Sequence, residues 1–270
     1  MFTDTLIEDR DLYRFLIETT AQAYGIDRPD SLLAKCNEIP DIHTEADVED
    51  RKALLPEIAA EAMTLIPGLI WIADGRTPWD VFHDVRFLGN SRLAQCSHKL
   101  KQDVADRYIK ENYVPDECVL YLGIDWTEDH RQAAPTANWS PYRVKFPMCE
   151  EPYVDKADML AELDWIGVTR PRLYSMGFAH NNCGGFCVRA GQGHFTRLLG
   201  TMPEQYAYHE SRERGIREYL GKDVSIMKRV RSGQTERLTM EQLRETYEAG
   251  RQAEIDRLDI GGCGCFVAAA

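Results

Sequence analysis

The sequence predicts an α/β fold in which helices cover a central, mostly parallel sheet in a three-layer arrangement. Two short apolar runs, residues 69–73 and 118–124, have the composition of buried parallel strands. Each run closes on an acidic residue, Asp74 or Asp125, and the first run passes through a polar turn into a helix start, which makes half of a strand–helix–strand unit. Ligands of such sheets bind beyond the carboxyl ends of the strands, so we expect the site at that edge.

Apolar periodicity predicts the helices of the first half of the chain. One helix is expected over residues 9–24, ending at Gly25, and a second over residues 51–65. The segment Thr77-Pro78-Trp79-Asp80 has the features of a helix start, with a threonine cap, a proline at the first position and an acidic residue in the first turn. Further helices are expected over residues 97–112 and around residues 159–166.

The character of the chain changes after about residue 170. A loop rich in glycine and cysteine is followed by helical patterns near residues 190–200, 203–220 and 239–249. We therefore divide the chain into an α/β nucleotide-binding-like core, residues 1–170, and a helical extension with cysteine motifs, residues 171–270. The extension is expected to pack on the core as part of one compact domain.

Composition restricts the classes of function. The net charge of −12 argues against an extended nucleic-acid surface, which needs a basic face, but leaves room for a small basic pocket. The first residues have no signal-peptide pattern, and no apolar run is long enough to cross a membrane. We therefore expect a cytoplasmic protein, in which clustered cysteines bind metal or carry out redox chemistry more often than they form structural disulfides.

Four cysteines occur in two tight pairs, Cys183-Gly-Gly-Phe-Cys187 and Cys263-Gly-Cys265. Each pair can direct two sulfurs at one metal ion or cluster, and the alternatives are an inert thiol set or a disulfide. The spacing differs from the zinc-ribbon pattern, so an iron–sulfur cluster is favoured over zinc. The isolated cysteines are interpreted as small hydrophobic residues of the core: Cys36, Cys118 and Cys149.

Cys96 lies in a basic segment that also contains Arg92, His98, Lys99 and Lys101. Cations near a helix N-terminus bind phosphate or sulfate and lower the pKa of a thiol, whereas the alternative is a solvated basic helix start. Cys96 is then a fifth ligand, a redox partner or a sulfur carrier.

A third cluster consists of Arg170-Pro171-Arg172 and, shortly after it, His180. Two arginines held by a proline can bind a phosphate bidentately. His180 lies three residues before Cys183, and its expected role is left open between metal ligand, general acid or base, and packed imidazole.

At these residues the chain resembles the phosphoadenosine-phosphosulfate (PAPS) reductase family, a branch of the adenine-nucleotide α-hydrolase-like, ATP-pyrophosphatase fold. Phe2-Thr3-Asp4-Thr5 is similar to the strand-end Asp-Thr motif of the family, and Cys96-Ser97-His98-Lys99 to its cysteine–lysine segment. The two cysteine motifs resemble those of a bacterial and phage subgroup labelled PAPS reductase-like.

The chain departs from the family in two ways. The Ser-Gly-Gly-x-x-Ser phosphate loop that precedes the Asp-Thr motif is absent, and so is the catalytic motif Glu-Cys-Gly-Leu/Ile-His of true PAPS reductases. Either the start is truncated, or the loop comes from a separate chain, or nucleotide hydrolysis has been lost.

The resemblance implies an enzyme of sulfur or nucleotide metabolism that is an oxidoreductase or a sulfur transferase. The expected cofactors are an adenine nucleotide and an iron–sulfur cluster, with zinc as the alternative. The expected metal ligands are Cys183, Cys187, Cys263 and Cys265. The candidate catalytic residues are Cys96, Lys99 and His180. The candidate nucleotide-binding residues are Asp4, Thr5, Asp74, Arg76, Arg92 and Arg172.

The expected partners are a small-molecule nucleotide, a thiol or electron-donor protein and a further copy of the chain, and no membrane. Two alternatives remain open. One is a catalytically degenerate or split-enzyme module that binds structural zinc, and the other is a component of a nucleic-acid sulfur-modification system.

Overall fold

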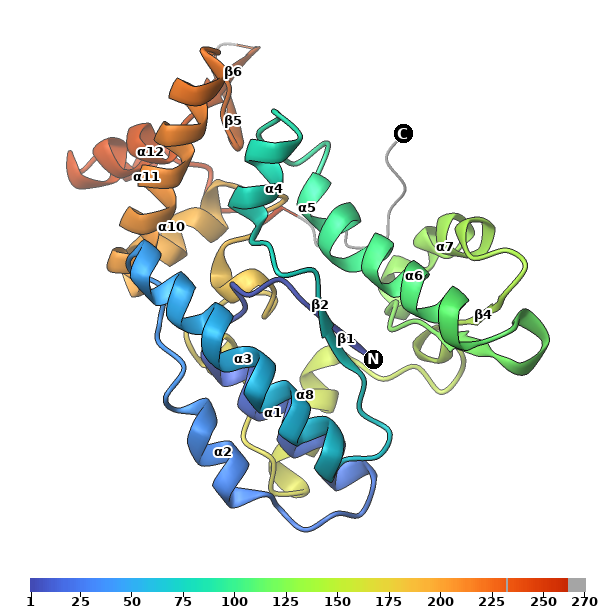
Figure 1. Ribbon diagram of the computed structural model, residues 1–270. Helices are drawn as coiled ribbons and strands as arrows, with labels where there is room; N and C mark the ends of the chain where they lie inside the picture. Colours follow the sequence, from blue (N-terminus) through green and yellow to red (C-terminus); the bar gives the residue numbers. More distant parts are fainter. Residues whose placement is uncertain (232, 262–270) are drawn as a thin grey trace.

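A computed structural model describes residues 1–231 and 233–261 (Figure 1). The protein is a mixture of helices and short strands, and the elements gather in three groups along the chain. The first group contains β1 (Phe2–Asp4), α1 (Arg10–Ala23), α2 (Asp30–Cys36), α3 (Glu45–Leu65) and β2 (Trp71–Ala73). The middle group contains α4 (Pro78–Asp84), α5 (Gln95–Ser97), η1 (His98–Gln102), α6 (Asp103–Asn112), η2 (Pro115–Glu117), β3 (Val119–Tyr121), η3 (Trp126–Arg131), α7 (Ala133–Asn138), β4 (Arg143–Lys145), η4 (Pro147–Cys149) and α8 (Lys156–Trp165). The last group contains α9 (Arg172–Ser175), η5 (Cys183–Gly185), α10 (Gln192–Thr201), α11 (Pro203–Leu220), β5 (Met227–Arg231), β6 (Gln234–Leu238), α12 (Met240–Glu248) and η6 (Gln252–Glu254).

The strands form three separate two-stranded sheets. β1 pairs with β2 and β3 pairs with β4, both in parallel, whereas β5 and β6 form an antiparallel hairpin. The single central sheet expected from the sequence is therefore not present in the part of the chain that the structure describes. The physical reason is that each parallel pair has only three-residue strands, and no described segment lies between the pairs as a strand that would join them.

The predicted helices are confirmed, and the structure shows why they begin where they do. Thr77 and Asp80 form a capping box at the start of α4, with Pro78 in the first turn. α3 begins six residues earlier than expected, because Thr44 and Asp47 form a second capping box there. Residues 95–112 form one nearly continuous helical segment, α5–η1–α6, in which η1 is a π-helical turn.

Three apolar clusters hold the elements together. α1, α2, α3 and β2 enclose the first cluster, in which Tyr13 and Trp71 stack with ring centroids 5.3 Å apart. The largest cluster joins residues from both sides of position 170, because Trp79 of α4 stacks on Phe186, with centroids 5.1 Å apart. The third cluster lies between α6 and the β3–β4 pair.

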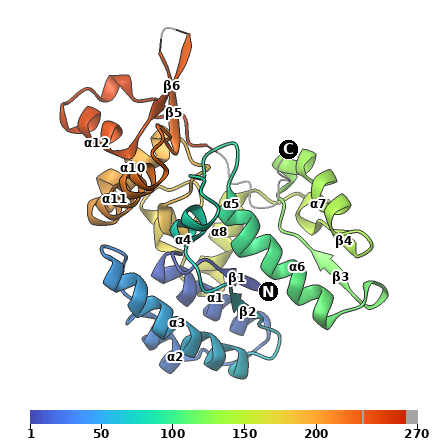
Figure 2. The same ribbon diagram turned by 45° about the horizontal axis from the view of Figure 1, so that its top comes forward.

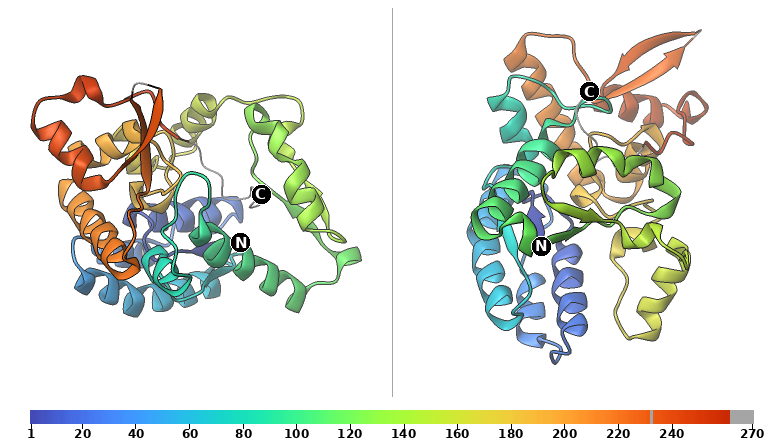
Figure 3. Two further views of the ribbon diagram at one scale, coloured as in Figure 1. Left: turned by 90° about the horizontal axis from the view of Figure 1, so that it is seen from above. Right: turned by 90° about the vertical axis from the view of Figure 1, so that its right-hand side faces the viewer.

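The helices near the two ends of the chain lie in different parts of the molecule. The helices α1, α2 and α3 lie together at one end, and α10, α11 and α12 form a separate group that carries the β5–β6 hairpin (Figures 1 and 2). The two hairpin strands project away from the rest of the molecule (Figure 3). Within the described ranges, no helix has the length and apolar character to span a membrane.

Candidate thiol site and its surroundings

Three cysteines from two distant segments line one small pocket. Cys96 comes from α5, and Cys183 and Cys187 come from the loop around η5; Thr5 and Lys101 line the same pocket. All three thiols are buried, and the volume of the pocket is about 20 Å³. The structure thus brings the basic segment of the sequence to the Gly-Gly-Phe loop.

Cys183 and Cys187 interact directly. A hydrogen bond between the two thiols, together with burial, raises the pKa of Cys183 well above that of an ordinary thiol, while Lys101 opposes this effect. The Cys183 thiol therefore carries its proton at neutral pH in this arrangement. A soft metal ion that bound Cys183 would have to displace this proton, which is the usual behaviour of thiol ligands.

A buried carboxylate holds the loop in place. Glu8 accepts a hydrogen bond from the backbone N–H of Cys183, and its other oxygen lies 3.1 Å from both Lys101 Nζ and Thr5 Oγ1. The side chain of Glu8 is 1% exposed, so its charge is compensated by Lys101 in a dry environment. The segment between β1 and α1 thereby fixes both the cysteine loop and η1.

The conformation of the loop explains one of its glycines. Cys183 has a φ of +51°, and Gly184 follows with a φ of +58°. A Cβ atom at Gly184 would lie 2.5 Å from the carbonyl oxygen of Ile7, which is too close for any side chain. Gly184 therefore lets the cysteine loop lie directly on the backbone of the β1–α1 segment.

The expected ligands Cys263 and Cys265 lie outside the described residues. The described chain ends beside the cysteine loop, because Gly261 forms an antiparallel bridge with Ala190, three residues after Cys187. A second contact holds the end of the described chain in this place, since the carbonyl oxygen of Asp259 accepts a hydrogen bond of 2.8 Å from Gly193 N. In the described ranges, no three His, Cys, Asp or Glu side chains form a group that could hold a metal ion.

His180 precedes Cys183 by three residues in the sequence, but its side chain lines a cavity of about 740 Å³ rather than the thiol pocket. It stacks on His194 with ring centroids 4.7 Å apart, and neither of its ring nitrogens has a hydrogen-bond partner among the described residues. Burial, with smaller contributions from His194, Lys156 and Lys101, lowers the pKa of His180 to about 4. The ring is therefore neutral at physiological pH, with one nitrogen that can donate a hydrogen bond and one that can accept it.

The three arginines expected to bind a nucleotide do not line the thiol pocket, and two of them are paired with carboxylates. Arg76 binds Asp74 and Asp84, and Arg172 binds Asp9 and Asp41. Each of these arginines is thus neutralised by two acids.

The remaining expected residues have different environments. Lys99 forms an ion pair of 2.9 Å with Asp103, and Arg92 is exposed. Asp4 is fully buried, and its carboxylate accepts hydrogen bonds from Leu6 N, Tyr13 Oη and Trp71 Nε1. These contacts show that Asp4 stabilises the fold around β1. Among the expected nucleotide-binding residues, Thr5 lines the thiol pocket.

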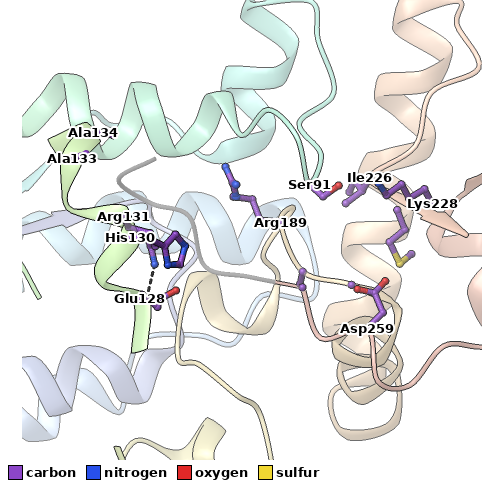
Figure 4. Close-up of a pocket in the computed structure, with 14 residues that line it drawn as sticks. Ser91, Glu128, His130, Arg131, Ala133, Ala134, Arg189, Ile226, Lys228 and Asp259 are labelled. Carbon is purple, nitrogen blue, oxygen red and sulfur yellow. Dashed lines mark ion pairs between the residues drawn. The ribbon is translucent and has the colours of Figure 1, made fainter. Parts of the chain in front are cut away.

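A larger cavity of about 610 Å³ adjoins the thiol pocket through Arg189, which lines both. Figure 4 shows Arg189 in the middle of this cavity, between His130 and Arg131 on one side and Ser91 and Lys228 on the other. No carboxylate of the described residues forms an ion pair with Arg189, whereas Arg131 is paired with Glu128. The cavity therefore offers cationic groups to an anion within reach of the thiols.

Three residues around the thiols were not predicted from the sequence: Glu8, Arg189 and Asn181. Arg189 could have been predicted from the sequence, because it lies two residues after Cys187 in the same loop. Glu8 gave no signal, because an acidic residue near a helix start is ordinarily solvated. The side-chain amide of Asn181 is buried without a partner in the described chain, a property that no local sequence pattern reveals.

No family model matches the chain, and no curated protein and no solved structure is significantly similar to it.

Proposed function

We propose that the protein is a PAPS reductase-like enzyme of sulfur or nucleotide metabolism that binds an adenine nucleotide and holds an iron–sulfur cluster. The cluster ligands in this proposal are Cys183, Cys187, Cys263 and Cys265, with Cys96 beside them. The observation that carries it is the convergence of Cys96, Cys183 and Cys187 on one pocket from segments about 90 residues apart in the sequence.

The course of the chain supports the participation of the last two cysteines. Cys263 follows Gly261 by two residues, and two residues of chain span at most about 7 Å. Because Gly261 is bridged to Ala190, the chain enters the tail next to the cysteine loop. The donor set is also chemically suitable, since thiolates are the ligands that iron–sulfur clusters use.

The nucleotide would bind in the 610 Å³ cavity beside the thiols. Arg189 and Lys228 supply positive charge there, and Ser91 supplies a hydroxyl group. A guanidinium that lacks a carboxylate partner is suited to a phosphate or sulfate group. In this proposal Arg189 positions the anionic end of the substrate toward the pocket that contains Cys96. The wider setting that we propose is cytoplasmic, with a thiol or electron-donor protein as the source of reducing equivalents and the adenine-nucleotide α-hydrolase-like fold as the scaffold.

Anaerobic purification followed by iron and sulfide analysis tests the cluster. We expect stoichiometric iron and acid-labile sulfide in the wild-type chain and a loss of most of both in Cys187→Ser. The matched control is Cys149→Ser, because Cys149 is a free cysteine outside the thiol pocket. A colourless wild-type protein that contains neither element removes the cluster from the proposal.

A second candidate is a structural zinc module without catalytic activity. The observation that favours it is the volume of the thiol pocket, about 20 Å³, which is the space of a single ion or water molecule. The pairing of Arg76 and Arg172 with acids points the same way, since it leaves these side chains engaged within the fold. Stoichiometric zinc together with no binding of ATP by calorimetry would support this candidate, and tight binding of ATP would exclude it.

A further inference from the structure

Two large cavities adjoin beside the β5–β6 hairpin. The first is the cavity of about 610 Å³ that contains Arg189, and the second, of about 710 Å³, is lined by the segment after α4, the connection from α11 to β5, and the hairpin. Ser91, Ile226 and Lys228 line both, and Figure 4 shows these three on the same side of the first cavity. Each cavity has the size of a site for one small ligand, so the two together, here called the joint cavity, have room for a longer one.

The lining of the joint cavity is positive, although the chain as a whole is negative. Seven basic and four acidic side chains line it, in a protein whose net charge is −12. A recess lined mainly by charges of one sign focuses their field and concentrates ligands of the opposite sign. The joint cavity is therefore a place at which this acidic protein attracts anions.

Five of the seven cations form no ion pair with a carboxylate of the described residues: Arg86, Arg92, Arg189, Lys222 and Lys228. Four of these five are exposed, and Arg189 is half-buried. The other two cations are already paired, Arg131 with Glu128 and Arg237 with Asp223. The positive charge of five side chains is thus left for a ligand.

The two remaining acids of the joint cavity do not compensate these five cations. Glu236 lies 3.0 Å from Arg229, its cross-strand partner in the hairpin. Asp259 accepts a hydrogen bond from Gln192 N. Neither acid forms an ion pair with one of the five cations in the part of the chain that the structure describes.

The hairpin adds a second observation that favours a bound anion. Lys228 of β5 lies in register with Arg237 of β6, and like charges directly opposite each other destabilise an antiparallel pair. Asp223 lies 3.0 Å from Arg237 and balances that side chain. An anion beside Lys228 would remove the remaining repulsion.

The free cations are spread along the joint cavity. Arg189 lines the first cavity only, Lys228 lines both, and Lys222, Arg86 and Arg92 line the second only. One phosphate group engages one or two such side chains. A row of cations that crosses two cavities instead matches a ligand with several anionic groups at intervals, as in a nucleic-acid backbone.

We propose that the joint cavity binds a short segment of single-stranded nucleic acid, with one nucleotide beside Arg189 and the phosphates of its neighbours near Lys228 and Lys222. The proposal rests on the nucleotide site of the proposed function and extends its ligand from a free nucleotide to a nucleotide within a strand. A flexible single strand can enter such a recess, whereas a double helix is too wide and too stiff to do so. Phe87, which lines the second cavity and is half-buried, supplies an aromatic group for base stacking that an acidic peptide would not use.

The probe is a fluorescein-labelled octathymidylate, and its binding to the full chain is measured by fluorescence anisotropy at several salt concentrations. We expect the affinity to fall by about three powers of ten for each tenfold increase in salt, because each neutralised phosphate of a single strand contributes about 0.7. The competitors are unlabelled octathymidylate, a duplex of the same length and a polyglutamate of the same charge. Octathymidylate should compete at least tenfold better than either of the others.

The matched variants are Lys222→Glu and Lys145→Glu. Both lysines are exposed and form no ion pair in the described ranges, but only Lys222 lines the joint cavity. Lys222→Glu should weaken the binding of octathymidylate at least tenfold, and Lys145→Glu less than threefold. Lys222→Glu should change the affinity for ATP less than threefold, because Lys222 does not line the cavity that contains Arg189. Thermal melting checks that both variants fold, and the competition with the wild-type chain decides if one does not.

The outcomes separate this proposal from the proposed function. Binding of ATP without binding of octathymidylate overturns the proposal and leaves the nucleotide site standing. Binding of octathymidylate without binding of ATP supports the proposal and excludes the free nucleotide as the ligand. Equal competition by the duplex or by polyglutamate overturns the proposal, and in the second case it assigns the joint cavity to an acidic protein segment. Equal effects of Lys222→Glu and Lys145→Glu also overturn it, since they would show a general attraction that does not depend on the joint cavity.

Discussion

Glu8 and Cys183 are 175 positions apart in the chain, yet the carboxylate of Glu8 accepts the backbone hydrogen bond of Cys183. The same carboxylate lies 3.1 Å from Lys101, which lines the thiol pocket. One buried acid therefore connects the segment after β1, the cysteine loop and η1. The arrangement of the thiol pocket therefore depends on the carboxylate of Glu8 as well as on the cysteines.

The variant Glu8→Gln tests this connection. It leaves Lys101 without its buried partner, so we expect the free energy of unfolding to fall by about 3 kcal/mol. We also expect Cys183 and Cys187 to react faster with a thiol reagent, because the loop loses its anchor. Urea unfolding and labelling kinetics measure the two effects, and Glu49→Gln on the exposed face of α3 is the control. Unchanged labelling rates would show that the loop does not depend on Glu8.

Gly184 should tolerate no side chain. Gly184→Ala must accommodate a Cβ atom 2.5 Å from Ile7 O at a φ of +58°, and we expect a loss of about 3 kcal/mol in unfolding free energy. Gly25→Ala is the matched control, because Gly25 has a φ of +63° but a Cβ atom there would meet no other atom within 4 Å. That variant should lose only about 1 kcal/mol. Equal losses would contradict the close approach of the loop to the β1–α1 segment.

The buried acid Asp4 should make stability depend on pH. Burial raises its pKa from 3.8 to about 6, although three hydrogen bonds oppose the effect. The folded state then binds the proton more tightly than the unfolded state, so stability falls as pH rises from about 4 to 6, by about 3 kcal/mol in total.

Asp4→Asn removes this titration. We expect the variant to lose the decline in unfolding free energy between pH 4 and pH 6, measured by urea unfolding at several pH values. The exposed control Asp50→Asn should keep the wild-type slope. If Asp4→Asn retained the full slope, another group would be responsible for the dependence.

Local signals made most of the helices predictable. The Thr77–Asp80 capping box and the apolar stripe of residues 9–24 are properties of neighbouring residues, and the structure confirms both elements. The strand at residues 69–73 was also found, although only Trp71–Ala73 pair. β4 was missed because Arg143 and Lys145 are exposed and charged, which is an atypical composition for a parallel strand.

The site was less predictable, because it depends on contacts between distant segments. The sequence indicated that Cys96, Cys183 and Cys187 are chemically important, and left open whether Cys96 lies beside the others. The pairing of Arg76 with Asp74 and Asp84 could not be read from spacing, since rotamers and loop geometry decide it. The sheet failed as a prediction for a similar reason: periodicity identifies strands but does not show which edges meet.

The cavity beside the thiols yields the prediction that bears most directly on function. Arg189 has no carboxylate partner among the described residues, so its charge is available to an anionic ligand. We expect Arg189→Gln to weaken the binding of ATP, measured by calorimetry, at least tenfold, because it removes a bidentate donor from the cavity. Arg76→Gln is the control, since Arg76 is already paired with Asp74 and Asp84 and should change the affinity less than twofold. If Arg76→Gln had the larger effect, the nucleotide would bind at the turn after β2 rather than beside Cys96, and the thiols and the nucleotide would belong to separate sites.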